Sequence, residues 1–150
     1  MKLVVQRVKY AKVSVGNELI SEINQGFLVF IGFSNNDIDT NFDKIVNKLI
    51  NLRIFEDEEN KMNLSLKDIN GEILLISQFT LYAKLNGLRP SFSDALNYDS
   101  AEKLYIKFYE LLKNSYKNVK KGVFGAKMDI ELLNNGPVTI IVDDKEIWYE

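Results

Sequence analysis

The run Gly26-Phe27-Leu28-Val29-Phe30-Ile31-Gly32 holds five large apolar residues between two glycines. A strand with one face in water alternates apolar and polar residues, so an unbroken apolar run of this length is typical of a strand covered on both faces. The segment therefore predicts an inner strand of a sheet.

Further strands are predicted on either side of this run. Residues 2–15 read as extended, and after a turn at Gly16-Asn17 the next strand covers residues 18–23. The most strand-like later run is Ile73–Leu81. The stretch from about Val119 to Val142 predicts two or three strands, joined by residues 122–125 and by a corner at Gly136-Pro137.

Two helices are predicted from apolar residues at helical spacing. The first ends near Arg53, and Thr40 and Asp43 are placed as its N-terminal cap pair. The second begins at residues 99–102, which resemble a capping box. The apolar stripes are Phe42, Ile45, Val46, Leu49 and Ile50 in the first helix, and Ala101, Leu104, Tyr105, Phe108, Leu111 and Leu112 in the second.

Strands outnumber helices, which favours an α/β fold with two helices packed on curved, barrel-like sheets that are mixed or largely antiparallel. A chain of 150 residues buries roughly 70% of the surface that its unfolded form exposes. Linkers, repeats and low-complexity tracts are not recognisable. We therefore expect one domain over residues 1–150.

Composition narrows the chemistry. The chain has no cysteine and no histidine, which excludes thiolate catalysis, Ser-His and Cys-His pairs and the usual zinc ligands. No metal-ligand spacing stands out, so no metal or cofactor is expected. Charges break every apolar run, which predicts a soluble, cytoplasmic protein without signal peptide or membrane span.

A net charge of −2 argues against a protein that coats nucleic acid by bulk electrostatics. The sequence leaves room for a local basic patch, because four lysines lie close together in it. A solvated lysine-rich turn is an equally good interpretation. The four are Lys117, Lys120, Lys121 and Lys127.

Two short stretches suggest a site. Ser77-Gln78-Phe79-Thr80 stands where a strand ends, and strand ends can present backbone N–H groups to a developing oxyanion. Asn134-Asn135-Gly136-Pro137-Val138-Thr139 contains a step that cannot be an ordinary ladder rung, because proline lacks an N–H and glycine tolerates unusual angles. Taken alone, the second stretch also fits a hairpin turn.

Together these stretches resemble the two signature motifs of the D-aminoacyl-tRNA deacylases of the bacterial and eukaryotic type. Further likeness in order and spacing extends over nearly the whole chain. It is carried by Val5-Gln6-Arg7-Val8, Asn51-Leu52-Arg53-Ile54-Phe55, Lys61-Met62-Asn63-Leu64, Arg89-Pro90-Ser91-Phe92 and Gly122-Val123-Phe124-Gly125. The loop of residues 83–88 is about one residue shorter than is usual in that family.

The resemblance implies the fold of that family and an editing hydrolase of the cytoplasm, without cofactor. Its substrate would be the ester of a D-amino acid, or of glycine mischarged on alanine tRNA, with the terminal adenosine of tRNA. The resemblance also implies a homodimer in which a cis Gly136-Pro137 peptide enters the partner's site. There the carbonyls of Gly136 and Pro137 would hold the α-amino group and exclude an L side chain.

The resemblance also assigns roles to single residues. Arg7 would brace the Gly-Pro loop, Phe124 and Gly125 would help to form the adenosine pocket, and Thr139 would contact the substrate or fill the next strand position. From the residues alone, Arg7 also fits an ordinary strand-surface charge, and Phe124 fits a core phenylalanine equally well. The scissile carbonyl would lie near Ser77–Thr80, with backbone N–H groups around Gln78 and Phe79 as oxyanion donors. Thr80 is the side chain that could act as a nucleophile, but no base is available to activate it. We therefore expect water to attack, assisted by the vicinal ribose hydroxyl of the tRNA.

Two other functions fit the same features. One is an editing domain like that of archaeal threonyl-tRNA synthetases, which removes L-serine. The other is a non-catalytic nucleic-acid-binding module on the same fold. The intact Gly136-Pro137 motif favours the deacylase over the first, and turnover would distinguish it from the second.

Overall fold

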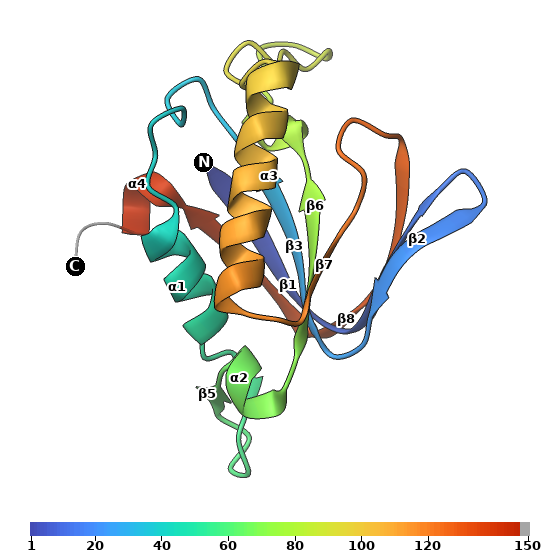
Figure 1. The fold of residues 1–150 in the computed structure, drawn as a ribbon, viewed down its shortest axis with the longest axis vertical. Helices are drawn as coiled ribbons and strands as arrows, with labels where there is room; N and C mark the ends of the chain where they lie inside the picture. Colours follow the sequence, from blue (N-terminus) through green and yellow to red (C-terminus); the bar gives the residue numbers. More distant parts are fainter. Residues whose placement is uncertain (148–150) are drawn as a thin grey trace.

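The computed structural model describes residues 1–147. Figure 1 shows a curled main sheet with helices against it, and Phe55–Glu56 and Met62–Leu64 form a separate two-stranded sheet. In residues 1–147, no helix is long and apolar enough to cross a membrane. The elements are, in chain order, β1 (Lys2–Val15), β2 (Glu18–Ile23), β3 (Gly26–Gly32), α1 (Asp43–Asn51), β4 (Phe55–Glu56), β5 (Met62–Leu64), α2 (Leu66–Ile69), β6 (Glu72–Ser77), the 3-10 helix η1 (Phe79–Tyr82), α3 (Tyr98–Ser115), β7 (Val119–Lys121), β8 (Met128–Asp143) and α4 (Asp144–Ile147).

The main sheet is mixed. Its strand order is β2-β1-β3-β6-β7, and β8 pairs with β1 as well. The pairs of β1 with β2, β3 and β8 are antiparallel, whereas β3–β6 and β6–β7 are parallel. Parallel neighbours need a crossover connection, and the segments that contain α1 and α3 supply the two crossovers. These helices contact each other on one face of the sheet (Figure 1).

Strand β3 is buried on both faces, as its apolar run predicts. Phe27, Val29 and Ile31 belong to the core between the sheet and the helices. Leu28 belongs to a second core inside the curl of the sheet, with partly buried Phe30 packed against it. Every residue of the predicted helix stripes is buried except Leu111, which packs partly buried against the first core.

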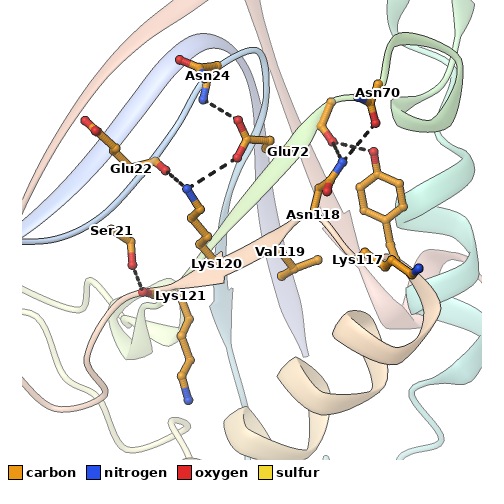
Figure 2. A network of polar contacts seen from close by, with 12 residues as sticks. Ser21, Glu22, Asn24, Asn70, Glu72, Lys117, Asn118, Val119, Lys120 and Lys121 are labelled. Atoms are coloured by element: carbon orange, nitrogen blue, oxygen red, sulfur yellow. Dashed lines mark hydrogen bonds and ion pairs between the residues drawn. The ribbon is translucent and has the colours of Figure 1, made fainter.

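The two ends of the strand order, β2 and β7, are joined by side chains instead of a ladder. The Ser21 hydroxyl donates to the Lys121 carbonyl at 2.8 Å, and the Lys120 ammonium donates to the Glu22 carbonyl at 2.7 Å. Figure 2 shows Lys120 between that carbonyl and the carboxylate of Glu72, 3.7 Å away. Lys120 therefore helps to hold the curled sheet together, and its charge is partly matched within the protein.

Several predicted element ends were wrong. Helix α1 has Phe42 at its N-cap without a side-chain cap, so Thr40 and Asp43 do not form the predicted pair. Helix α3 begins at Tyr98, and the Asn97 side chain, not a box at residues 99–102, accepts the Ser100 N–H. Asparagine and aspartate are equally good N-cap residues, so residue type could not show whether α3 begins after Asn97 or after Asp99.

The predicted strand of residues 73–81 is also too long. It stops at Ser77, because the chain turns into η1. Residues 128–143 form one strand and not two, so the Gly136-Pro137 step is neither a hairpin turn nor a corner between strands.

Candidate active site

The Gly136-Pro137 step lies in a bulge of β8. Pairing with β1 passes from Gln6 opposite Thr139 to Val8 opposite Asn134, so Asn135–Val138 face Arg7 alone. We call Asn135–Val138 the bulge. A proline without an N–H and a glycine with positive φ of 134° suit this interruption of the ladder. The Gly136-Pro137 peptide bond is cis, and both residues are exposed.

Arg7 holds the bulge from behind. Its Nε donates to the Asn135 carbonyl at 2.8 Å, and its Nη1 donates to the Ile54 carbonyl at 2.8 Å. Its Nη2 lies 3.7 Å from the Glu56 carboxylate. The Arg7 side chain is only 4% exposed. A buried guanidinium has to find acceptors for its donors, so its two carbonyl partners fix the position of the bulge.

Asn134 bridges the bulge from its other end. Its side-chain carbonyl accepts the Val138 N–H at 2.8 Å, and its amide donates to the Thr139 hydroxyl at 2.9 Å. The Gln6 side chain also donates to that hydroxyl, at 3.4 Å. Sequence reasoning gave Asn134 no role of its own. The available signal was an asparagine before a Gly-Pro step, since asparagine side chains often bond to backbone a few residues away.

The other motif lines a cavity of about 560 Å³. Ser77, Gln78 and Phe79 form one side of it, where β6 passes into η1, and Phe124 and Gly125 come from the loop before β8. This volume is in the range of small-molecule sites. Sequence reasoning missed the part of the lining that comes from the segment before α3 and from its first residue, which includes Phe92, Leu96, Asn97 and Tyr98.

Some of the polar groups at the end of β6 already have hydrogen-bond partners within the protein. The Gln78 N–H donates to the Ile31 carbonyl at 2.7 Å, so this group already has an acceptor in the structure, and its role as an oxyanion donor stays a prediction. Phe79 begins η1, and the first N–H groups of a helical turn have no acceptor within that turn. The Phe79 N–H is therefore the better candidate donor.

The Thr80 hydroxyl is exposed and accepts a hydrogen bond from the Gln78 side-chain amide at 2.6 Å. An amide NH₂ group is a donor and cannot take a proton from a hydroxyl. Nothing in this contact activates Thr80 as a nucleophile.

Aromatic rings form two walls of the cavity. The Phe79 and Phe92 rings meet edge to face with centroids 4.9 Å apart. In the second wall, the ring centroids of Phe124 and Tyr98 are 5.1 Å apart. Tyr105 does not line the cavity, and its ring centroid lies 5.6 Å from that of Phe124. The Tyr105 hydroxyl donates to the Leu75 carbonyl at 2.8 Å, and burial raises the pKa of this phenol, so it stays neutral.

Neither the bulge nor Arg7 or Thr139 lines the cavity. Ile130, which does line it, pairs with Val13, whereas the bulge lies opposite Arg7. These positions are roughly 20 Å apart along β1, at about 3.3 Å per residue. The ten predicted site residues thus form two separate groups. Ser77, Gln78, Phe79, Thr80, Phe124 and Gly125 are at or beside the cavity, and Arg7, Gly136, Pro137 and Thr139 are at the bulge.

Within residues 1–147, no three acidic side chains lie close enough together to hold a metal ion. The basic cluster suggested by the sequence is not one free patch. Lys120 binds the Glu22 carbonyl, and the Lys121 ammonium lies 4.5 Å from the centre of the Tyr109 ring.

The chain is similar to known proteins over nearly its whole length. Residues 4–143 match the family model described as D-Tyr-tRNA(Tyr) deacylase. A relative from Fusobacterium nucleatum named D-aminoacyl-tRNA deacylase is 55% identical over 147 residues, which are 97% of each chain.

Two solved structures are also similar. One, named c-Myc DNA Unwinding Element Binding Protein, is 44% identical with a TM-score of 0.89, and the match covers 95% of this chain and 98% of that one. The other is described as a probable eukaryotic D-amino acid tRNA deacylase. It is 18% identical with a TM-score of 0.80 and covers 94% and 97% of the two chains, which shows a shared fold.

Proposed function

The chain belongs to the D-Tyr-tRNA(Tyr) deacylase family, and we propose that it selects D-aminoacyl-tRNA by presenting the bulge to the substrate's α-carbon. The coarser activity follows from the family and its relatives: the protein is a hydrolase that acts on D-aminoacyl-tRNA. The proposal concerns how the two separate groups of residues carry out that reaction.

The bulge suits a chirality filter because it offers main-chain atoms that cannot move easily. The carbonyls of Gly136 and Pro137 accept hydrogen bonds from the substrate's α-ammonium group. An L side chain would then point at the bulge, whereas a D side chain points away from it. Arg7 and Asn134 hold the backbone on either side, at Asn135 and Val138. Thr139 supports the bulge through its bond with Asn134 and takes no direct part in selection.

A filter of this kind reads the α-carbon and not the side chain. It therefore accepts many D-amino acids. Glycine has no side chain to exclude, so glycine mischarged on alanine tRNA is admitted as well.

The cavity holds the ester and the terminal adenosine. The adenine ring packs on Phe124 beside Gly125, where aromatic stacking on a base is sequence-tolerant and favourable. The scissile carbonyl lies at the end of β6 between Ser77 and Thr80, with the Phe79 N–H as oxyanion donor. Removing one such donor typically costs about 10²–10³ in kcat.

Water attacks the ester carbon, and the ribose hydroxyl next to the ester assists it. The ester C–O bond then breaks, the ribose oxygen takes a proton, and the free D-amino acid leaves. The hydrogen bond that Thr80 accepts from Gln78 supports this choice, because it supplies no base for a threonine nucleophile. Gln78 orients Thr80, and both shape the mouth of the cavity.

Two copies of the chain complete the site. The bulge and the cavity of one chain lie at different places along β8, so the bulge serves the cavity of a partner in a homodimer.

The other candidate functions are less favoured. The curated relatives are deacylases over their full length, and the name of the DNA-unwinding-element relative describes that protein alone.

The deciding experiment compares hydrolysis of D-tyrosyl-tRNA and L-tyrosyl-tRNA by the purified protein with chelator present. We expect rapid loss of the D ester alone. Cleavage of both esters would contradict the filter, and cleavage of neither would favour the binding module.

The absence of cysteine from the sequence allows a direct test of the dimer. One chain carries Asn135→Cys at the bulge, and a second carries Asn97→Cys at the cavity. A short bismaleimide should link the two chains when they are mixed. Mixed chains that do not link, while a single chain with both cysteines links internally, would place bulge and cavity together in one protomer.

A further inference from the structure

Tyr98 is an exposed aromatic residue on the wall of the cavity. Its side chain is 58% exposed, although it lines the same cavity as Ser77 and Phe124. It is the first residue of α3, ahead of the buried stripe that starts at Ala101. Packing of α3 on the core therefore does not account for the ring at position 98.

The surroundings of Tyr98 hold the ring in one place. Its plane lies at 71° to that of Phe124, with centroids 5.1 Å apart. Gly125 has a φ of +75°, and a Cβ there would collide with the hydroxyl and ring of Tyr98. The missing side chain at Gly125 thus makes room for the Tyr98 ring, which packs directly against the loop between β7 and β8.

We propose that Tyr98 is a positioning residue that stacks on a base of the unpaired 3′ end of the tRNA. The inference rests on the proposed function, because it assumes that the cavity takes the tRNA terminus. Two rings that are nearly perpendicular cannot both lie flat on one base. A base on Phe124 turns its edge to Tyr98, so the exposed face of Tyr98 is free for the preceding base.

Stacking on an exposed ring adds binding without entering the chemistry. Removal of one stacked base contact should weaken binding roughly 10-fold. The effect should fall on KM and leave kcat unchanged, since Tyr98 belongs to the Phe124 wall and is not among the residues placed at the ester. A purely structural role would instead lower thermal stability, or lower kcat along with kcat/KM.

The kinetic test uses Tyr98→Leu and Tyr98→Phe with D-tyrosyl-tRNA. We expect KM to rise roughly 10-fold for Tyr98→Leu with kcat kept, and both constants to stay near wild type for Tyr98→Phe, which retains the ring. Tyr10→Leu is the matched control, because Tyr10 is 37% exposed on β1 and does not line this cavity. Unchanged KM for Tyr98→Leu would overturn the inference.

A binding test does not depend on turnover. Two tRNA probes carry 2-aminopurine in place of the terminal adenine, or a fluorescent cytosine analogue at the preceding position. We expect wild type to quench the second probe, and Tyr98→Leu to lose that quenching while still quenching the first. Loss of quenching only for the terminal probe, or for neither, would overturn the assignment.

Two controls separate the possible failures. If wild type does not cleave D-tyrosyl-tRNA, the proposed function fails, whatever the probes show. If wild type cleaves it and Tyr98→Leu instead changes the sedimentation coefficient, Tyr98 contacts another copy of the chain and the inference fails alone. Gly125→Ala should displace the ring and reproduce the KM effect, and should add little to it in the Tyr98→Leu background.

Discussion

The bulge of β8 and the cavity at the end of β6 present opposite kinds of surface. The cavity is concave and lined mostly by apolar residues, with aromatic rings on two sides. The bulge is exposed main chain, held from behind by one buried arginine and from the side by one asparagine. A concave aromatic surface can accommodate a base and an ester, whereas fixed backbone can reject a wrong configuration. Binding and selection are thus built from different parts of the chain.

The strongest way to break this comparison is to remove the support of the bulge. Arg7→Met leaves the Asn135 and Ile54 carbonyls without their donor, which should cost about 3 kcal/mol of unfolding free energy. We also expect L-tyrosyl-tRNA to become a substrate. Thermal unfolding and parallel D and L hydrolysis measure the two effects. Lys12→Met, at a half-exposed ion pair of the same strand, should change neither, and equal losses in both variants would deny Arg7 its special role.

A smaller change acts on the bulge itself. Gly136→Ala introduces a Cβ 2.9 Å from Nη2 of Arg7 and 2.8 Å from Cγ2 of Val138, at a φ of +134°. We expect the unfolding free energy to fall by about 1–2 kcal/mol. The selectivity for the D over the L ester should fall more than the rate for the D ester. The selectivity is measured as the ratio of kcat/KM for the two esters. An unchanged ratio in a folded variant would remove the bulge from the filter.

Asn134→Ala should sharpen the comparison, because it loosens the side of the bulge that Arg7 does not hold. It removes the acceptor of the Val138 N–H, a contact that is worth about 1 kcal/mol. Thr139→Val removes only the hydroxyl that Asn134 binds, so it should lower the unfolding free energy by less. A denaturant titration of the two variants measures both losses. A reversed order would mean that Thr139 and not Asn134 keeps the bulge in place.

The smallest effect is expected on the cavity side, at Thr80. Thr80→Val keeps the shape of the side chain and removes the hydroxyl bound by Gln78. Since that hydroxyl has no base beside it, kcat for D-tyrosyl-tRNA should fall by less than about 10-fold. Single-turnover hydrolysis is the measurement. A loss beyond about 10³ in a folded variant that still binds tRNA would restore threonine as the nucleophile.

The sequence was sufficient for elements whose pattern is long. The apolar run of β3 and the stripes of α1 and α3 predicted burial correctly, because periodicity over many residues averages out local exceptions. The α/β class and the curled, mixed sheet followed from them. The short helices α2 and α4 span four residues each and have no readable period.

The sequence failed where single contacts decide. The Ile73–Leu81 run looks like one strand, yet the chain leaves the sheet after Ser77. Likewise the local pattern makes Arg7 an ordinary strand charge, and only the family resemblance predicted that it braces the Gly-Pro loop. Its carbonyl partners, at Ile54 and Asn135, are 47 and 128 residues away in the chain, and no local pattern indicates them.

The bulge has a consequence for behaviour in concentrated solution. In the part of the chain that is described, β8 pairs only with β1, which leaves a strand of 16 residues with an open edge. Long flat edges are templates on which other chains add strands and form aggregates. Proline lacks the N–H for such pairing, and the bulge shifts the strand out of register midway. The residues proposed to read chirality therefore also interrupt the edge and protect the protein from polymerising.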